Sequence, residues 1–152
     1  MSNKKLQLEQ LDRKLKVFGP ASKIDPPDIG WIKVIRNSLG MSLQQLANKL
    51  SVTKQSVREI EIREMQGSIT LRSLKETADA LDMQLVYGFV PKDVTIEALV
   101  DRKAKELATR IVLRTSTTMK LEDQENSKER LRNAIAERTD KIKNELPKVL
   151  WD

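Results

Sequence analysis

The stretch LGMSLQQLANKLSVTKQSVREIE at residues 39–61 limits the fold of this chain more than any other part of its sequence. Ser42 followed by Gln45 has the spacing of a capping box, and leucines recur behind it at helical intervals. Thr53 has the position of a second N-cap, with Val57 on the inward face of the helix that it opens. The pattern therefore predicts two helices joined by a turn of about four residues, which is the connection of a helix-turn-helix unit.

Helices are also expected on both sides of this stretch. One covers about residues 30–39 and should bury Trp31, Ile32 and Ile35, because these side chains recur at helical spacing. Another begins at Thr70, where LRSLKETADALD repeats apolar residues every three or four positions. Together these segments predict a compact helical domain.

The rest of the chain predicts one strand and further helices. MQLVYGFVP at residues 83–91 is rich in β-formers that alternate along the segment, so we expect one short strand there. Two longer helices should begin near Thr95 and at Ser127. Aromatic residues are 3% of the chain and charged residues 33%, a composition that suits helices better than sheets. The predicted fold class is mainly α, with one short β-strand and a C-terminal helical extension.

Pro and Gly in FGPASKIDPPDIG indicate a linker after a short N-terminal helix, so the chain divides into three parts. We expect an N-terminal helix and linker at residues 1–27, a compact domain at 28–91, and at 92–152 a helical extension that dimerises or binds a partner.

The chain contains no Cys and no His. This removes disulfides, thiol nucleophiles, imidazole bases and the ordinary structural zinc sites. We therefore expect no enzyme activity, no catalytic residue, no metal and no cofactor. No apolar run approaches the roughly 18 residues that span a bilayer, and the N-terminus is too polar for a secretory signal. A cytoplasmic protein with no membrane attachment is expected.

The net charge of the chain is +6, an excess that is common among nucleic-acid-binding proteins. The basic surplus is concentrated between residues 31 and 63. In that segment the cations are Lys33, Arg36, Lys49, Lys54, Arg58 and Arg63, against only Glu59 and Glu61.

The second helix of the predicted helix-turn-helix unit has a polar outward face. With Val57 packed inward, the side chains of Lys54, Gln55, Arg58 and Glu59 point outward. Gln55 offers a donor and an acceptor suited to adenine, Lys54 a donor to guanine or phosphate, and Glu59 an acceptor for the cytosine amino group. The alternative is that this is the solvated face of an ordinary helix.

Residues 39–61 resemble the helix-turn-helix unit of the Xre and phage-repressor family, and ITLRSLKETADALD is similar to that family's next helix. Two departures are visible, because Ser51 and Arg63 stand where the family usually has glycine. The resemblance implies a phage-repressor-like fold and a homodimer that binds a palindromic operator in double-stranded DNA, one half-site per unit. It implies base contacts at Lys54, Gln55 and Glu59, and contacts nearer the DNA backbone at Gln44, Thr53 and Ser56.

A wider resemblance covers nearly the whole chain. The succession QLDRKL, GWIKVIRNSLGMSLQQLANKLSVTKQSV, GSITLRSLKETADALDMQLVYGFVP, TSTTMKLEDQ and LWD is similar to the family called mobile mystery protein A. That resemblance implies a small Xre-type repressor of its own operon, encoded beside a Fic-domain protein in the manner of an antitoxin and its toxin.

Fic enzymes typically transfer AMP to a protein hydroxyl, and many are inhibited by a helix with Ser or Thr, three residues, Glu, and then Gly or Asn. TMKLED supplies Thr118 and Glu122 at that spacing, although Asp123 follows. The resemblance implies that Glu122 pairs with the Fic arginine that holds the ATP γ-phosphate. The alternatives are that these residues are caps and solvated surface, and that the protein is a stand-alone Xre repressor whose C-terminal helices only dimerise or bind another protein.

Overall fold

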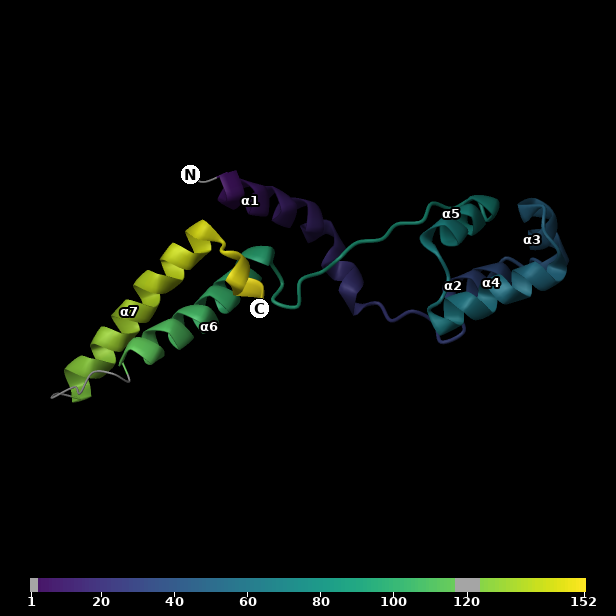
Figure 1. Cartoon of the computed structure of the whole chain (residues 1–152). Helices are drawn as coiled ribbons and strands as arrows, with labels where there is room; N and C mark the ends of the chain where they lie inside the picture. Colours follow the sequence, from purple (N-terminus) through teal and green to yellow (C-terminus); the bar gives the residue numbers. More distant parts are fainter. Residues whose placement is uncertain (1–2, 117–123) are drawn as a thin grey trace. The chain divides into compact units, whose positions relative to one another are not determined.

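The computed structural model of the chain describes residues 3–116 and 124–152, and these residues are almost entirely helical (Figure 1). The α-helices are α1 (Asn3–Leu15), α2 (Trp31–Ser38), α3 (Leu43–Leu50), α4 (Lys54–Gln66), α5 (Leu71–Ala80), α6 (Ile96–Ser116) and α7 (Gln124–Glu145). Short 3-10 turns follow α1 at Lys16–Phe18 and Pro20–Lys23, and another closes the chain at Lys148–Trp151. The mainly α prediction is confirmed.

The chain forms two compact units. One is Lys23–Tyr87, and the other joins Met1–Ser22 to Gly88–Asp152. Among the helices that the structure describes, none is long and apolar enough to cross a membrane.

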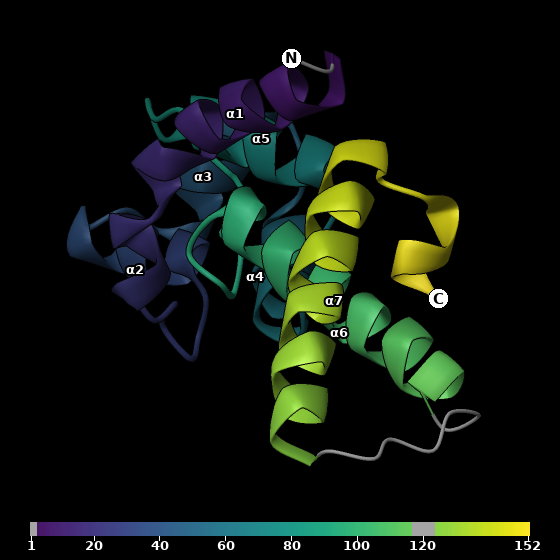
Figure 2. The same ribbon diagram turned by 90° about the vertical axis from the view of Figure 1, so that its left-hand side faces the viewer.

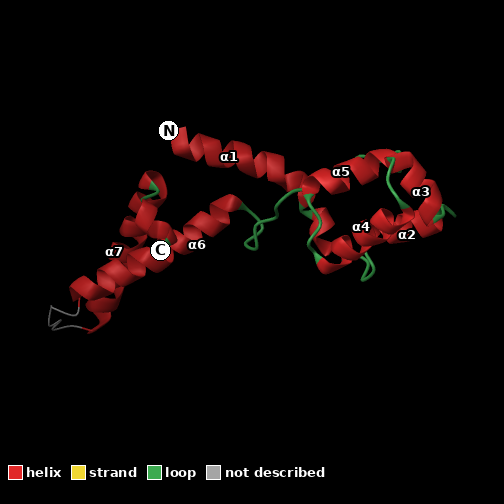
Figure 3. Cartoon of the chain, turned by 45° about the vertical axis from the view of Figure 1, so that its right-hand side comes forward, coloured by secondary structure: helices red, strands yellow, loops and turns green. Residues whose placement is uncertain are grey.

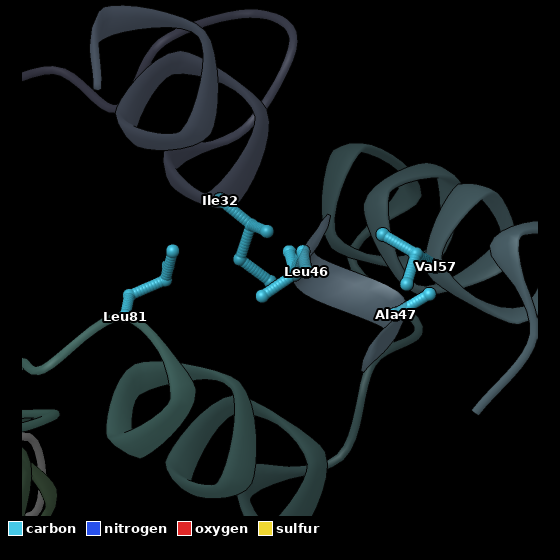
Figure 4. Close-up of a cluster of buried hydrophobic side chains, with 5 residues drawn as sticks. All are labelled: Ile32, Leu46, Ala47, Val57 and Leu81. Carbon is cyan, nitrogen blue, oxygen red and sulfur yellow. The ribbon is translucent and has the colours of Figure 1, made fainter. Parts of the chain in front are cut away.

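The unit Lys23–Tyr87 holds α2 to α5 around one apolar cluster. Its buried members come from all four helices and their ends, and Figure 4 shows their side chains converging: Ile32, Leu46, Ala47, Val57 and Leu81. Burial of such side chains contributes about 1.5–3 kcal/mol each for the larger ones. The inward positions of Ile32 and Val57 agree with the sequence prediction, whereas Trp31 does not, since it is 44% exposed.

The predicted strand at residues 83–91 is not confirmed. Residues 83–90 have no regular secondary structure, and no strand is drawn anywhere in the described residues (Figure 3). The physical reason is that a strand is defined by its hydrogen-bonded ladder with a second strand, and the described part of the chain supplies none. Composition alone predicts an extended segment but not its partner.

The second unit is built on α6 and α7, which run side by side in opposite directions (Figure 1, Figure 2). Their shared core is apolar and is closed by the last turn of the chain: Ala104, Leu107, Ala108, Ile142 and Leu150. Helix α1 belongs to this unit too. Asp12 accepts hydrogen bonds from the backbone N–H groups of Ile96 (2.6 Å) and Glu97 (3.1 Å), so α1 supplies a cap for α6. Thr95 accepts a third bond at the same end, from the N–H of Ala98 (3.0 Å), and α6 begins at Ile96, close to the predicted start. Helix α7 begins at Gln124, three residues before the predicted start.

Candidate nucleic-acid interface

Helices α3 and α4 are joined by only three residues, 51–53, one fewer than the sequence predicts. Ser51 adopts a left-handed conformation with φ 55°, so this serine takes the place that a glycine usually fills. Its own N–H donates to Asn48 (3.2 Å), and the N–H of Val52 donates to the carbonyl oxygen of Ala47 (3.0 Å). Two of the last four carbonyls of α3 are thereby satisfied, which helps to fix the angle at which the chain enters α4.

Both helices of the motif are capped by hydroxyl side chains. Ser42 and Gln45 form the predicted capping box, with distances of 3.0 Å and 2.8 Å between the paired atoms. Thr53 Oγ1 accepts from the N–H of Ser56 at 3.1 Å and lies 2.9 Å from the Ser56 hydroxyl oxygen. Such caps contribute about 1 kcal/mol each. Thr53 and Ser56 therefore have a structural role at the start of α4, and the DNA-backbone contacts predicted for them remain a prediction.

The outward face of α4 carries the predicted base-reading residues. Val57 is fully buried, and Lys54, Gln55, Arg58 and Glu59 are all exposed. Within the described residues, the side chains of Lys54, Gln55 and Arg58 make no hydrogen bond and no ion pair. Their donors and acceptors are therefore available to bind a ligand.

The other two predicted contact residues have partners on their own helices. Glu59 lies 3.6 Å from Arg63, one turn further along α4, and both side chains are more than half exposed. An exposed pair of this kind contributes at most about 1 kcal/mol and is readily exchanged for another partner. Gln44 is exposed on α3 and donates to Asn48 at 2.9 Å.

A buried ion pair holds α4 against α2. Arg36 Nε lies 2.6 Å from Glu61, and a second guanidinium nitrogen lies 3.3 Å from the other carboxylate oxygen. The same guanidinium donates to the carbonyl oxygen of Met41 at 3.0 Å, so its polar atoms are shared between α4 and the turn before α3. Arg36 was counted in the basic surplus of the sequence, but it is buried and neutralised. Glu61, left out of the predicted site, has a fold-supporting role.

A second carboxylate of α4 caps α2. Glu64 accepts hydrogen bonds from the backbone N–H groups of Trp31 (3.0 Å) and Ile32 (2.8 Å). Gly30 precedes them with φ 89°, and a Cβ there would lie 2.8 Å from a Glu64 oxygen. The sequence prediction missed Glu64, because the cap acts across 32 positions; the only signal was a second acid three residues after Glu61, on the same face of α4.

The remaining predicted residues, Thr118 and Glu122, lie outside the described residues. The structure therefore brings together the seven predicted DNA-binding residues on α3, the turn and α4, and leaves the predicted inhibitory pair untested.

Residues 32–87 match the helix-turn-helix family. No curated protein and no solved structure gives a match. The match covers α2 to α5 and the segment after them, so this part of the chain is a helix-turn-helix domain of the Xre type, a DNA-binding domain of transcription regulators. The wider resemblance to the Fic-associated family has no support from these comparisons.

Proposed function

We propose that this chain is a sequence-specific DNA-binding transcriptional regulator that represses its own operon and binds a palindromic operator as a homodimer. The observation that carries the proposal is the outward face of α4. Lys54, Gln55 and Arg58 are exposed and have no partner among the described residues, and two carboxylates on the inner side of their helix tie it to α2. A recognition helix needs this combination of free polar groups and a fixed backbone.

In the proposed complex α4 lies in the major groove. Gln55 pairs with an adenine edge through its amide, which offers one donor and one acceptor in the required geometry. Lys54 donates to guanine or to a phosphate, and Glu59 accepts from a cytosine amino group after exchanging its contact with Arg63. Arg58 lies one turn after Lys54 on the same face and adds a further donor.

Backbone contacts position this helix. Gln44 on α3, with Thr53 and Ser56 at the start of α4, presents polar groups at the end of the motif that approaches the phosphates. Such contacts carry no sequence information, and their loss weakens binding to every duplex equally. We propose no catalytic activity and no cofactor for the chain, and a cytoplasmic location remains its prediction.

The test compares two glutamines of one helix. Gln55→Ala should weaken binding to the operator, selected from random duplexes with the natural chain, by roughly 5- to 150-fold, which corresponds to about 1–3 kcal/mol, and should leave binding to random DNA unchanged. Gln66→Ala, an exposed glutamine at the far end of α4, is the matched control and should change neither. If Gln55→Ala lowers the affinity for operator and for random DNA equally, Gln55 does not read a base.

We also propose an antitoxin role, supported by the spacing of Thr118 and Glu122 and by the family resemblance. Glu122 would hold the γ-phosphate arginine of a neighbouring Fic-domain protein, and Thr118 would add a hydrogen bond. AMP transfer by that protein should fall when the natural chain is added and recover with Glu122→Ala. Glu129→Ala, an exposed glutamate of α7, is the control and should inhibit like the natural chain. Equal inhibition by both variants would remove the role of Glu122, and no inhibition by the natural chain would leave a stand-alone repressor whose C-terminal helices dimerise or bind another protein.

A further inference from the structure

The segment between α5 and α6 leaves a run of backbone groups unpaired. Met83 N–H donates to the carbonyl oxygen of Ala78 (2.8 Å), and the carbonyl oxygen of Pro91 accepts from Val94 (3.0 Å). Between these two bonds, no backbone group of residues 84–90 has a hydrogen-bond partner in the described part of the chain. Residues 83–90 contain no helix, turn or bend, so the segment is locally extended. An extended run with free N–H and C=O groups is a template for a second strand.

The same segment exposes large apolar side chains. Tyr87 is 56% exposed and Phe89 is 80% exposed. Gly88, between them, lies against the ring of Phe18, where a Cβ would come within 2.5 Å of the ring. A glycine allows the backbone to pack this closely against the ring. The side chains on either side of it, Tyr87 and Phe89, remain exposed. Two exposed aromatic residues on an uncharged segment, residues 83–90, mark a contact surface.

An apolar groove begins where this segment leaves α5. It has a volume of about 320 Å³ and is lined by α2, α5 and the segment itself, including Trp31, Ile35, Leu74 and Leu85. Trp31, expected to be buried from the sequence, is 44% exposed at this groove. The chain therefore carries both an exposed aromatic side chain, Phe89, and an open apolar site of suitable chemistry.

We propose that residues 84–90 of two copies pair as antiparallel strands around a two-fold axis at Tyr87, so that Phe89 of each copy enters the apolar groove of the other. This inference rests on the proposed function, because a helix-turn-helix unit reads half of a palindrome and the second half needs a second copy. The pairing of two copies would also provide the second strand that the segment, rich in β-forming residues, lacks within its own described chain.

The register follows from symmetry and side-chain chemistry. When a two-fold axis passes through one residue of an antiparallel pair, each residue before that position lies opposite the residue equally far after it in the second copy. The two side chains of such a pair point to the same face of the sheet. Centring on Tyr87 puts Leu85, which lines the groove, opposite Phe89 of the second copy. Cross-strand neighbours have Cβ atoms about 4.5–5.5 Å apart, so Phe89 of the second copy reaches the groove beside Leu85. Centring the pair on either neighbour of Tyr87 loses this match.

The surface available is of the size that a dimer needs. Taking about 200 Å² for an aromatic side chain, the exposed parts of Tyr87 and Phe89 amount to roughly 500 Å² over two copies. Val86, Met83, Trp31 and the two backbones add to this. The total approaches the roughly 1,200 Å² at which specific interfaces begin.

The absence of cysteine from the chain makes a direct test available. Tyr87→Cys places two thiols at the two-fold axis, where Cα atoms lie about 4.5–5.5 Å apart, within the range of a disulfide. Mild oxidation of the full chain should give a covalent dimer on a non-reducing gel. Val94→Cys is the control: Val94 is 81% exposed and lies outside the paired strands, so this variant should stay monomeric on the gel. Equal cross-linking of both variants would overturn the register.

A second measurement keeps the two proposals distinguishable. In sedimentation without DNA, Phe89→Ser should raise the dimer dissociation constant roughly tenfold or more, and Val94→Ser should leave it unchanged. A natural chain that is monomeric, or a dimer that Phe89→Ser does not weaken, would overturn the interface while operator reading by Gln55 is still intact. A dimer that cross-links through Tyr87→Cys but binds operator and random DNA equally would instead overturn the proposed function and keep the interface. Cross-linking of Tyr87→Cys only to other proteins would assign the segment to a different partner and reject the second copy.

Discussion

Removal of the Glu61 carboxylate is the sharpest test of how α4 is held in place. Glu61→Ala leaves Arg36 of α2 buried, with its guanidinium facing the space that the carboxylate occupied on α4. Two contacts are lost, at 2.6 Å and 3.3 Å, and only the bond to the carbonyl oxygen of Met41 survives. A charge that stays buried after its partner is removed retains most of its desolvation cost.

The expected size of this effect follows from the burial of both partners. Breaking a buried ion pair by removing one member costs about 3–5 kcal/mol, against a total free energy of unfolding of about 5–15 kcal/mol for an ordinary domain. The Glu61→Ala variant is therefore expected to lose about a fifth of its stability or more. Replacing both partners, as Arg36→Met with Glu61→Leu, should restore most of the loss, because no unpaired charge then remains.

Urea unfolding followed by circular dichroism measures the difference. The control is Glu59→Ala, on the same helix, which removes an exposed pair with Arg63 and should cost at most about 1 kcal/mol. A loss for Glu61→Ala no larger than that for Glu59→Ala would refute the reasoning. A double variant as unstable as the single one would show that the cost does not come from the unpaired charge of Arg36.

Three further outcomes are expected. Gly30→Ala should destabilise the fold by about 1–3 kcal/mol in urea, more than Gly40→Ala, because both sites have positive φ but only at Gly30 does the new Cβ meet a side chain. The hydrogen bond from Arg102 holds the pKa of Asp93 below its ordinary value. The pair therefore stabilises the fold at pH values above the pKa of Asp93 in the unfolded chain, and this stabilisation is lost as the pH falls through the pKa of Asp93 in the folded chain. NMR titration of Arg102→Ala should show a higher pKa for Asp93, and an unchanged pKa would contradict the assignment. If Lys54 contacts phosphate, Lys54→Ala should lower the salt dependence of DNA binding by about one unit of slope, and an unchanged slope with altered base preference would assign it to guanine.

The features predicted correctly from the sequence are those that act over a few residues. The caps at Ser42, Thr53 and Thr70 each bond to the N–H three positions later, so spacing alone reveals them. The caps supplied by Glu64 and Asp12 were not predicted, because they cross 32 and 84 positions and depend on which helices pack together.

Two other differences have the same origin. Arg36 reads as a surface cation in the sequence, since nothing local indicates that Glu61 will enclose it. Residues 83–91 read as a strand because their composition is right, yet a strand needs a partner that composition does not identify. The predicted recognition residues needed only the period of α4 and one buried anchor, Val57, which is why their exposure was predictable.

The two tasks of α4 are separated along its length. Its first turns present Lys54, Gln55 and Arg58 outward, without partners in residues 3–116 and 124–152, whereas Glu61 and Glu64 in its later turns hold α2. Gln55→Ala should therefore change the free energy of unfolding by less than about 0.5 kcal/mol, because an exposed side chain without contacts adds little to stability.

The converse holds for Glu61→Ala. A loss of about 3 kcal/mol from a domain with about 8 kcal/mol of stability leaves more than 99% of molecules folded. Operator affinity should therefore fall only if the loss of the ion pair changes the position of α4 relative to α2. Measuring unfolding and operator binding on both variants separates the two roles. A stability loss in Gln55→Ala as large as that of Glu61→Ala would mean that the outward face of α4 supports the fold, and the assignment of that face to DNA would lose its physical basis.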